Sequence, residues 1–325
     1  MKPLAVYVHL PFCERRCGYC DFVSGCDLTK IDAYLDRLTA EIRAFDFSPY
    51  TVQSIYLGGG TPSLLSPEQI KRLFACLPSG AGEVTIEVNP NSLTTAKCDA
   101  YRAVGINRIS IGVQSFDDAT LRDLGRLHDV KQAVAAINLA GQYFHNVSID
   151  LIKDIPHHRF VTPPGTVLNA IQHISIYSLT RDDHCVLETD EPVHLPRAFR
   201  RYEVSNYARA GYESRHNLTY WTGGEYIGFG CAAHSFIGGE RFANTDDLLN
   251  YQRYTTAVLT PAMARQEQIM LGLRLRTGVS LTLLTGREDA IKRLQTHGLV
   301  RIKNDHLIAT AKGLKLLNQL WLQLV

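Results

Sequence analysis

The stretch Val6-Tyr-Val-His-Leu-Pro-Phe-Cys-Glu-Arg-Arg-Cys-Gly-Tyr-Cys-Asp-Phe22 leads from an apolar segment into a loop with three cysteines. The apolar segment predicts a β-strand that ends near Leu10. Cys13, Cys17 and Cys20 follow with the spacing C-x3-C-x2-C. Three thiolates spaced in this way can hold three corners of a [4Fe–4S] cluster within one loop. The fourth iron then has no protein ligand and is open to an outside one.

Two other uses of these thiols are possible. A structural zinc could take Cys26 or His9 as its fourth ligand, but the usual zinc pattern has a second C-x2-C or His pair, which the sequence lacks. Disulfides are the other alternative. Cys76, Cys98, Cys185 and Cys231 are scattered singly, which is typical of buried thiols in a reducing compartment. We therefore expect a cytoplasmic protein.

The first half of the chain alternates strand and helix patterns. The sequence predicts strands over Leu4–Leu10, Ser54–Leu57, Val84–Val88, Arg108–Val113, Val147–Ile152 and Ile174–Leu179. Helical patterns between most of them cover Thr29–Ala44, Pro67–Leu77, Asp117–Leu124 and Val130–Ala140. A β/α series of this kind indicates an α/β fold with a parallel sheet.

Unusual residues fall at the carboxyl ends of these strands. The cysteine loop follows the first strand and Gly58-Gly-Gly-Thr-Pro62 the second, while Glu87, Gln114 and Asp150 lie at or near the ends of the next three. In a β/α barrel those ends form one mouth, so the pattern predicts a single site. Individually, the glycines could form a tight turn, Glu87 could cap a helix, Gln114 could bridge strands, and Asp150 could pair with Arg108 or Arg126.

Together, the cysteine motif, Gly58–Pro62, Ile109-Ser-Ile-Gly-Val-Gln-Ser-Phe116 and Asp150-Leu-Ile152 resemble the radical S-adenosylmethionine (SAM) superfamily. The resemblance is to its oxygen-independent coproporphyrinogen III oxidase family and covers most of the chain. It implies a partial (β/α)6 barrel in which SAM chelates the free iron and is cleaved to a 5′-deoxyadenosyl radical.

The resemblance also assigns residues. Cys13, Cys17 and Cys20 match the cluster ligands, and the positions that match SAM contacts are Tyr7, Gly59, Gly60, Thr61, Glu87, Gln114, Arg126 and Asp150, with Ala232 in a loop near the cluster. Carboxylates and amides suit the sulfonium, ammonium and ribose hydroxyls of SAM, and a cation suits its carboxylate.

Two details indicate the branch of the family. Phe22 stands where the oxidases carry a further cysteine, and His216-Asn-Leu-Thr-Tyr-Trp221 is similar to the H-N-x-x-Y-W signature of the haem chaperone branch, HemW. This branch is thought to bind haem and pass it to an acceptor protein. A coproporphyrinogen dehydrogenase and a degenerate paralogue without turnover remain the alternatives.

His216 is the candidate haem ligand, because imidazole commonly binds haem iron and the nearby Tyr220 and Trp221 could stack on a porphyrin. The alternative is a packed loop in which His216 satisfies backbone groups. His157 and His158, in a proline-rich loop, are expected to be solvated surface.

The chain also departs from the family. The stretch from Lys153 to Arg201 is short, Asp154 replaces a glycine, and the helix before Tyr202–Tyr207 is largely missing. We therefore expect Ile174, Ile176 and Leu179 to face water, with reduced stability or self-association, including a homodimer, as the result.

The predicted domains are a barrel with strand extensions (1–235) and a C-terminal appendage (236–325). The appendage is expected to be winged-helix-like, with helices over Met263–Leu275 and Arg287–Gly298, a hairpin around Asn304-Asp305 and a final helix over Ala311–Leu324.

Composition limits the partners of the protein. With 34 Lys and Arg against 32 Asp and Glu, the net charge of +2 does not favour nucleic acid. The sequence contains no apolar run of about 18 residues, the length that a membrane span requires. The start of the chain also lacks the features of a signal peptide. The expected partners are a haem-accepting protein and a reductant such as flavodoxin or ferredoxin.

Overall fold

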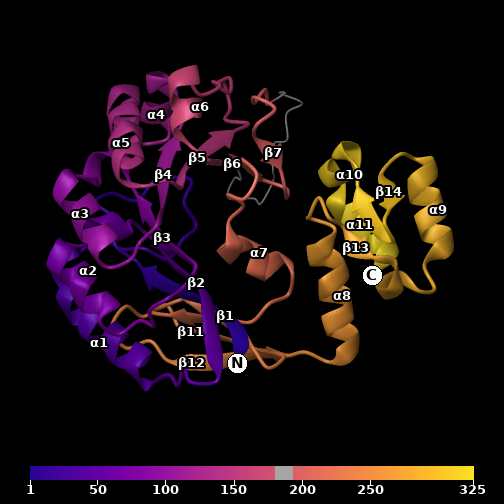
Figure 1. Ribbon diagram of the computed structural model, residues 1–325, viewed down its shortest axis with the longest axis horizontal. Coiled ribbons are helices and arrows are strands. Elements are labelled where there is room, and N and C mark those ends of the chain that lie inside the picture. The colour runs from indigo at the N-terminus through magenta and orange to yellow at the C-terminus, as the bar shows by residue number, and fades with distance from the viewer. Residues whose placement is uncertain (180–192) are drawn as a thin grey trace.

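The computed structural model describes residues 1–179 and 193–325. Six parallel strands pair in chain order (Figure 1), namely β1 (Lys2–Leu10), β2 (Tyr50–Gly59), β3 (Glu83–Val88), β4 (Arg108–Gln114), β5 (Val147–Lys153) and β6 (His173–Ser178). All six were predicted from the sequence, and the main difference is that β2 begins at Tyr50 rather than Ser54. The predicted α/β fold with a parallel sheet is confirmed.

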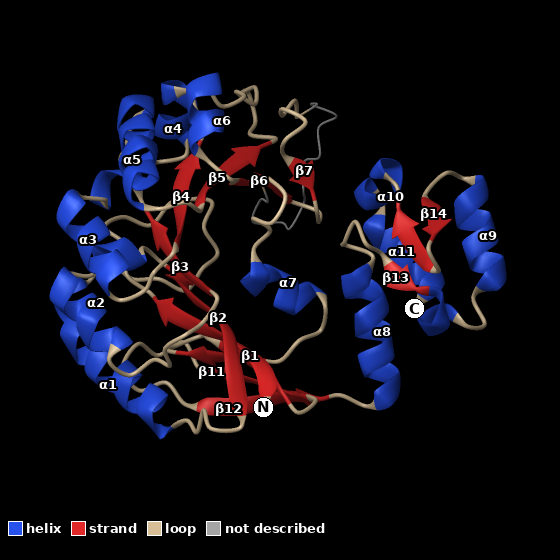
Figure 2. Ribbon diagram, viewed as in Figure 1, coloured by secondary structure: helices blue, strands red, loops and turns tan. Residues whose placement is uncertain are grey.

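Further strands extend the sheet at both edges. β9 (Tyr226–Phe229) pairs parallel to β1, followed by antiparallel β10 (His234–Ile237), β11 (Glu240–Asn244) and β12 (Arg253–Val258). Beyond β6 lie the short antiparallel strands β8 (Asn206–Ala208) and β7 (Arg200–Arg201). The strands form an open arc, and helix α7 (Arg215–Trp221) lies on its inner side (Figure 2).

Helices cover the outer side of the arc (Figure 1). They are α1 (Ile31–Ala44), α2 (Pro67–Phe74), α3 (Thr95–Ala103), α4 (Asp118–Asp123), α5 (Val130–Tyr143) and α6 (Gly165–Ala170). Local capping explains where some of them begin. Before α2, the Ser66 hydroxyl accepts from the Gln69 N–H and the Gln69 side chain accepts from the Ser66 N–H, which forms a capping box.

The flank of β6 is covered, contrary to expectation. Ile174 and Ile176 are 0% and 4% exposed, and Phe199, which precedes β7, is buried in the same apolar cluster. The expected exposure of these two isoleucines is therefore wrong, because both belong to the main apolar cluster of the barrel, to which Phe199 of the shortened stretch also contributes. The part of that stretch from 180 to 192 lies outside the described residues.

Asp154 occupies the left-handed region that a glycine would adopt there, with a φ of 60°. Asp is among the few other residues that tolerate this conformation. Its buried carboxylate lies 2.8 Å from the Lys153 ammonium. The left-handed backbone at Asp154 is therefore one that a glycine could also adopt.

The C-terminal appendage has its own small antiparallel sheet, formed by β13 (Val279–Ser280), β15 (His306–Ala309) and β14 (Val300–Lys303), with helices α8 (Pro261–Gly272) and α9 (Glu288–Thr296). Asn304 and Asp305 have φ angles of 48° and 58°, as a two-residue hairpin turn requires, so the predicted hairpin is confirmed.

The predicted final helix is two helices, α10 (Ala311–Lys315) and α11 (Leu317–Leu324). Leu316 between them has φ −116° and ψ 32°, which is not helical. The division into domains remains a prediction. Strands β11 and β12 follow residue 235 yet belong to the barrel sheet, and the second apolar cluster begins only at Ile269.

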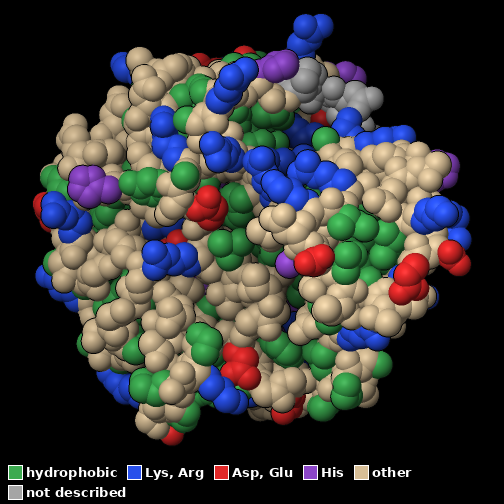
Figure 3. Space-filling view, turned by 45° about the vertical axis from the view of Figure 1, so that its right-hand side comes forward, with side chains coloured by type: hydrophobic (Ala, Val, Ile, Leu, Met, Phe, Trp, Pro, Cys, Tyr) green, Lys and Arg blue, Asp and Glu red, His purple; other side chains and the backbone are tan. Residues whose placement is uncertain are grey.

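On the surface, Lys and Arg side chains gather in the upper central part of the face in Figure 3, whereas Asp and Glu side chains lie scattered over it. The small net charge is therefore unevenly distributed. Within residues 1–179 and 193–325, no helix has the length and apolar character that a bilayer span requires.

Candidate cofactor site at the barrel mouth

The cysteine loop closes on itself directly after β1. The Gly25 N–H donates to the Pro11 carbonyl (2.7 Å) and the Cys13 N–H to the Gly25 carbonyl (3.0 Å). Cys13, Cys17 and Cys20 lie within this closed loop as half-buried free thiols, whereas Cys26 lies beyond it and is exposed. The backbone thus holds the three predicted ligands together and leaves the fourth nearby cysteine outside.

Burial raises the pKa of the Cys13 and Cys20 thiols. Two side chains from elsewhere donate to the sulfur atoms: the Thr61 hydroxyl to Cys13 (3.7 Å) and the Arg126 guanidinium to Cys17 (3.6 Å). Hydrogen bonds to sulfur stabilise a thiolate. Donors of this kind suit anionic sulfur ligands.

In the part of the chain that the structure describes, no three His, Cys, Asp or Glu side chains are grouped as ligands of one metal ion. The thiolates of a [4Fe–4S] cluster each bind a different iron. Their spacing is therefore set by the cluster and not by the radius of a single ion.

The glycine run packs the end of β2 against the cysteine loop. A Cβ on Gly60 would lie 2.5 Å from the Phe12 carbonyl oxygen, and a Cβ on Gly59 (φ 113°) would lie 2.6 Å from the His9 ring. The Thr61 N–H donates to the same Phe12 carbonyl (2.7 Å). The absence of side chains at these glycines therefore allows β2 to pack closely against His9 and Phe12 of the chain itself.

Two carboxyl groups lie on β3 and β5, the strands on either side of β4. Glu87 accepts hydrogen bonds from the Tyr56 hydroxyl (2.7 Å) and the Gly59 N–H (3.3 Å), and Asp150 from the Ser110 hydroxyl (3.1 Å). Removal from water raises the pKa of Glu87 to about 7 and also raises the pKa of Asp150. Among the described residues, neither Arg108 nor Arg126 forms a direct ion pair with Asp150, although the positive charge of both lowers the pKa of Asp150 against the larger effect of burial.

Arg126 joins the cysteine loop to the strand ends. Besides Cys17, its guanidinium donates to the Asn89 side chain (2.7 Å) and the Gly112 carbonyl (2.8 Å). Sequence analysis missed Asn89, although it stands at the carboxyl end of β3, where the other polar residues were found. Gln114, at the end of β4, has a φ of 69° and adjoins a register shift between β4 and β5.

The remaining predicted contacts lie on the β1 and β9 side. The Tyr7 hydroxyl is 3.0 Å from the His9 Nδ1 atom. Ala232 has a φ of 55°, and its N–H donates to the Thr245 carbonyl (2.9 Å). Its loop is tied to helix α1, because the Glu41 carboxylate accepts from the Gly230 N–H (2.9 Å).

His216 lies inside the barrel with both ring nitrogens occupied. Its Nδ1 atom is 2.9 Å from the Ser54 hydroxyl and its Nε2 atom 2.8 Å from the Tyr220 hydroxyl. The residue is 1% exposed, and burial lowers the pKa of its ring to about 3. In this conformation no ring nitrogen is available to a haem iron, so the structure favours the packing role that the sequence left open.

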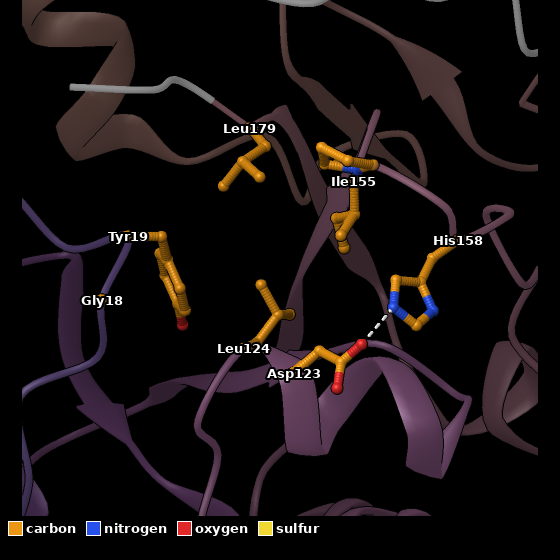
Figure 4. A pocket seen from close by; sticks show the side chains of 8 residues that line it. Gly18, Tyr19, Asp123, Leu124, Ile155, His158 and Leu179 are labelled. Carbon is orange, nitrogen blue, oxygen red and sulfur yellow. Dashed lines mark hydrogen bonds and ion pairs between the residues drawn. The ribbon is translucent and has the colours of Figure 1, made fainter. Parts of the chain in front are cut away.

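A pocket of about 350 Å³ lies beside the cysteine loop. Tyr19, Leu124, Ile155 and Leu179 surround it (Figure 4), and at its rim the His158 ring lies 2.7 Å from the Asp123 carboxylate. The expectation of a solvated His158 is therefore wrong, since its side chain is 16% exposed and paired.

Three comparisons bear on this arrangement. A family model described as the radical SAM superfamily matches residues 7–160. The heme chaperone HemW of Lactococcus lactis is 33% identical over 86% of this chain and 83% of its own length. HemW of Bacillus subtilis is 31% identical over 98% of both chains, in an alignment of 371 positions, which exceeds the 325 residues here and so includes gaps in this chain.

Among solved structures, coproporphyrinogen III oxidase (HemN) from Escherichia coli superimposes with a TM-score of 0.80 at 23% identity. The match covers 99% of this chain and 90% of that chain. This likeness shows that the two chains share a fold.

Proposed function

Because the chain belongs to the radical SAM superfamily and, within it, to the HemW family of heme chaperones, we propose that it binds a [4Fe–4S] cluster, SAM and haem, and delivers haem to an acceptor protein. We assign the cluster to Cys13, Cys17 and Cys20. The acceptor and an electron donor such as flavodoxin or ferredoxin are the proposed partners. The free buried thiols of Cys98 and Cys231 agree with a cytoplasmic location.

The position of Arg126 is the observation that supports the cofactor site most. One guanidinium contacts Cys17 of the cluster loop and also Asn89 and the Gly112 carbonyl at the ends of two strands. A cation held between a cluster ligand and the strand ends suits a carboxylate of SAM bound at the fourth iron. When bound there, SAM would supply the reductive cleavage chemistry of the superfamily.

The protein's own residues would orient SAM. Glu87 and Asp150 offer carboxyl acceptors to ribose hydroxyls and the amino group, and Gln114 offers an amide. Tyr7, Gly59, Gly60, Thr61 and Ala232 complete the proposed contacts. The left-handed backbone at Gly59, Gln114 and Ala232 supports this assignment, because such conformations gather at functional sites.

For haem, the support is the signature from His216 to Trp221 together with the names of the relatives. The hydrogen bonds of His216 to Ser54 and Tyr220 argue for a role in holding α7 inside the barrel. We therefore propose that haem is bound without His216 as a ligand of its iron. The gathered Lys and Arg side chains in Figure 3 suit the two propionates of haem.

The cluster assignment is tested by anaerobic reconstitution followed by iron and sulfide analysis. We expect one [4Fe–4S] cluster per chain, its loss when Cys13, Cys17 and Cys20 are all changed to Ala, and its retention in Cys26→Ala, because Cys26 lies outside the closed loop. Full iron and sulfide in the triple variant would rule out the assignment.

The haem proposal is tested by titrating reconstituted protein with haem and, separately, with coproporphyrinogen III under reducing anaerobic conditions. We expect a Soret band and no protoporphyrinogen IX. His216→Asn should keep the Soret band of the wild type, although it should be less stable by about 1–3 kcal/mol because Ser54 or Tyr220 is left without a partner. Steady formation of protoporphyrinogen would favour the dehydrogenase instead, and loss of the Soret band in His216→Asn would restore His216 as a ligand.

A further inference from the structure

We propose that Arg274, at the end of helix α8 in the appendage, is a positioning residue for the SAM site and acts through α7 on Glu87. The inference rests on the proposed function for the identity of the ligand. It assigns to the appendage a part in forming a site whose proposed contacts all lie in the barrel.

Arg274 is held between two residues of the barrel. The centre of its guanidinium lies 4.1 Å from the centre of the Trp221 ring, and one nitrogen lies 3.5 Å from the Glu203 carboxylate. The Glu203 side chain is 1% exposed and that of Arg274 23%. A charge pair that is largely removed from water, with a cation stacked on an indole, favours one geometry of the junction.

This contact holds one end of α7, and the barrel holds the other. At the start of the helix, the buried Glu83 carboxylate accepts from the N–H groups of Arg215 (3.0 Å) and His216 (2.9 Å). Trp221 is the last residue of α7. Its indole N–H is buried and has no hydrogen-bond partner among the described residues, which leaves the stacked Arg274 as a polar contact of the ring.

From α7, a series of side-chain contacts leads to the proposed SAM site. The Tyr220 hydroxyl, next to Trp221, is 2.8 Å from the His216 Nε2 atom, and the His216 ring stacks on Tyr56 with ring centres 5.0 Å apart. The Tyr56 hydroxyl donates to Glu87 (2.7 Å). A displaced α7 would therefore displace the side chain that orients the Glu87 carboxyl.

A purely structural role for Arg274 would attach the appendage without affecting Glu87. If Arg274 only attaches the appendage, its substitution should change the appendage alone. If it positions α7, the change should extend to Tyr56 and Glu87. Hydrogen exchange on the protein without cofactors measures this spread, because the Gly59 N–H donates to Glu87 and lies on β2 beside Tyr56.

The experiment compares Arg274→Ala, Arg274→Lys and Arg276→Ala in a Trp321→Phe background, which leaves Trp221 as the sole tryptophan of the chain. Arg276 is the matched control, since it is an exposed arginine in the same segment and its backbone N–H bond to Tyr202 survives substitution. In Arg274→Ala we expect faster exchange over α7 and over Tyr56–Gly60, and stronger quenching of Trp221 fluorescence by acrylamide. Arg274→Lys should restore part of the protection, and Arg276→Ala should match the parent.

In reconstituted protein, Arg274→Ala should bind SAM about fivefold more weakly, as measured by equilibrium dialysis. Exchange changes confined to the appendage, or SAM affinity within twofold of the parent despite a looser α7, would overturn the proposal. If the parent itself binds no SAM, the proposed function fails, and the link from Arg274 to Glu87 is still decided by the exchange data alone.

Discussion

Glu87 is a proposed SAM contact whose burial lowers the free energy of unfolding at neutral pH. Its carboxyl lies between the ends of β2 and β3, where removal from water raises its pKa to about 7, while Tyr56 and Gly59 donate to it. Between the pKa of an unfolded Glu and pH 7, the folded protein holds a proton that the unfolded chain has released. The contribution of this group to the free energy of unfolding is therefore greatest below the pKa of an unfolded Glu, and it decreases as the pH rises from there to about 7.

We expect Glu87→Gln, without cofactors, to be more stable than the wild type at pH 8 by about 2 kcal/mol, the order of free energy that the raised pKa of Glu87 represents. The difference should fall to less than half of this value at pH 5, because the folded carboxyl is then protonated and the pH is close to the pKa of an unfolded glutamate, about 4.3. Urea unfolding at both pH values measures it, with Glu14→Gln, at an exposed glutamate of the cysteine loop, as the control. An equal difference at pH 5 and pH 8 would contradict the raised pKa. After reconstitution, the same variant should bind SAM more weakly.

At the scale of elements, Phe199, just before β7, contributes to the apolar cluster of the barrel. Phe199 is 5% exposed, and the Arg209 guanidinium lies 4.8 Å from the centre of its ring. Arg209 also donates to the carbonyls of Ile171 (3.1 Å) and Leu168 (3.0 Å), which ties this segment to α6. Lower stability was expected because Ile174 and Ile176 would face water, and both are buried.

We expect Phe199→Ala to lower the free energy of unfolding by about 3 kcal/mol, because it opens a cavity over β6. Phe22→Ala removes the same atoms from a ring that is 61% exposed, and should change stability by less than about 0.5 kcal/mol. Denaturant unfolding of both variants decides this. Similar small effects would mean that the segment before β7 does not cover the flank.

At the scale of the molecule, the barrel and the appendage each bury their own apolar cluster. The junction between them includes the Arg274 contacts and a hydrogen bond from the Arg276 N–H to the Tyr202 carbonyl (2.9 Å). Val204 of the barrel also packs against the apolar cluster of the appendage. A small junction of this kind can position α7 and still leave two separate cores that unfold at different denaturant concentrations.

We therefore expect two urea transitions. Leu320→Ala and Leu35→Ala remove equally buried leucines from the appendage and the barrel, and each should shift one transition by about 2–5 kcal/mol. Circular dichroism combined with tryptophan fluorescence would follow both. A single transition shifted equally by both variants would show one cooperative unit instead.

Features that depend on residues close together in the chain could be predicted from the sequence alone. The six parallel strands follow from apolar runs, the cysteine loop from the spacing of Cys13, Cys17 and Cys20, and the hairpin at Asn304 and Asp305 from turn chemistry. The position of Glu87 near other polar groups was predictable as well, because parallel strands bring their carboxyl ends to one edge.

The surroundings of His216 and the burial of β6 depend on contacts between segments far apart in the chain, so they became visible only in the folded structure. The Ser54 hydroxyl, which contacts the His216 ring, lies 162 positions away in the sequence. The Glu83 carboxylate, which accepts a hydrogen bond from the His216 N–H, lies 133 positions away. No local pattern indicates which distant hydroxyl or carboxylate will satisfy a buried ring. Ile174 and Ile176 were misjudged for the same physical reason, since burial depends on which segment returns to cover a strand, and that is set by packing across the whole chain.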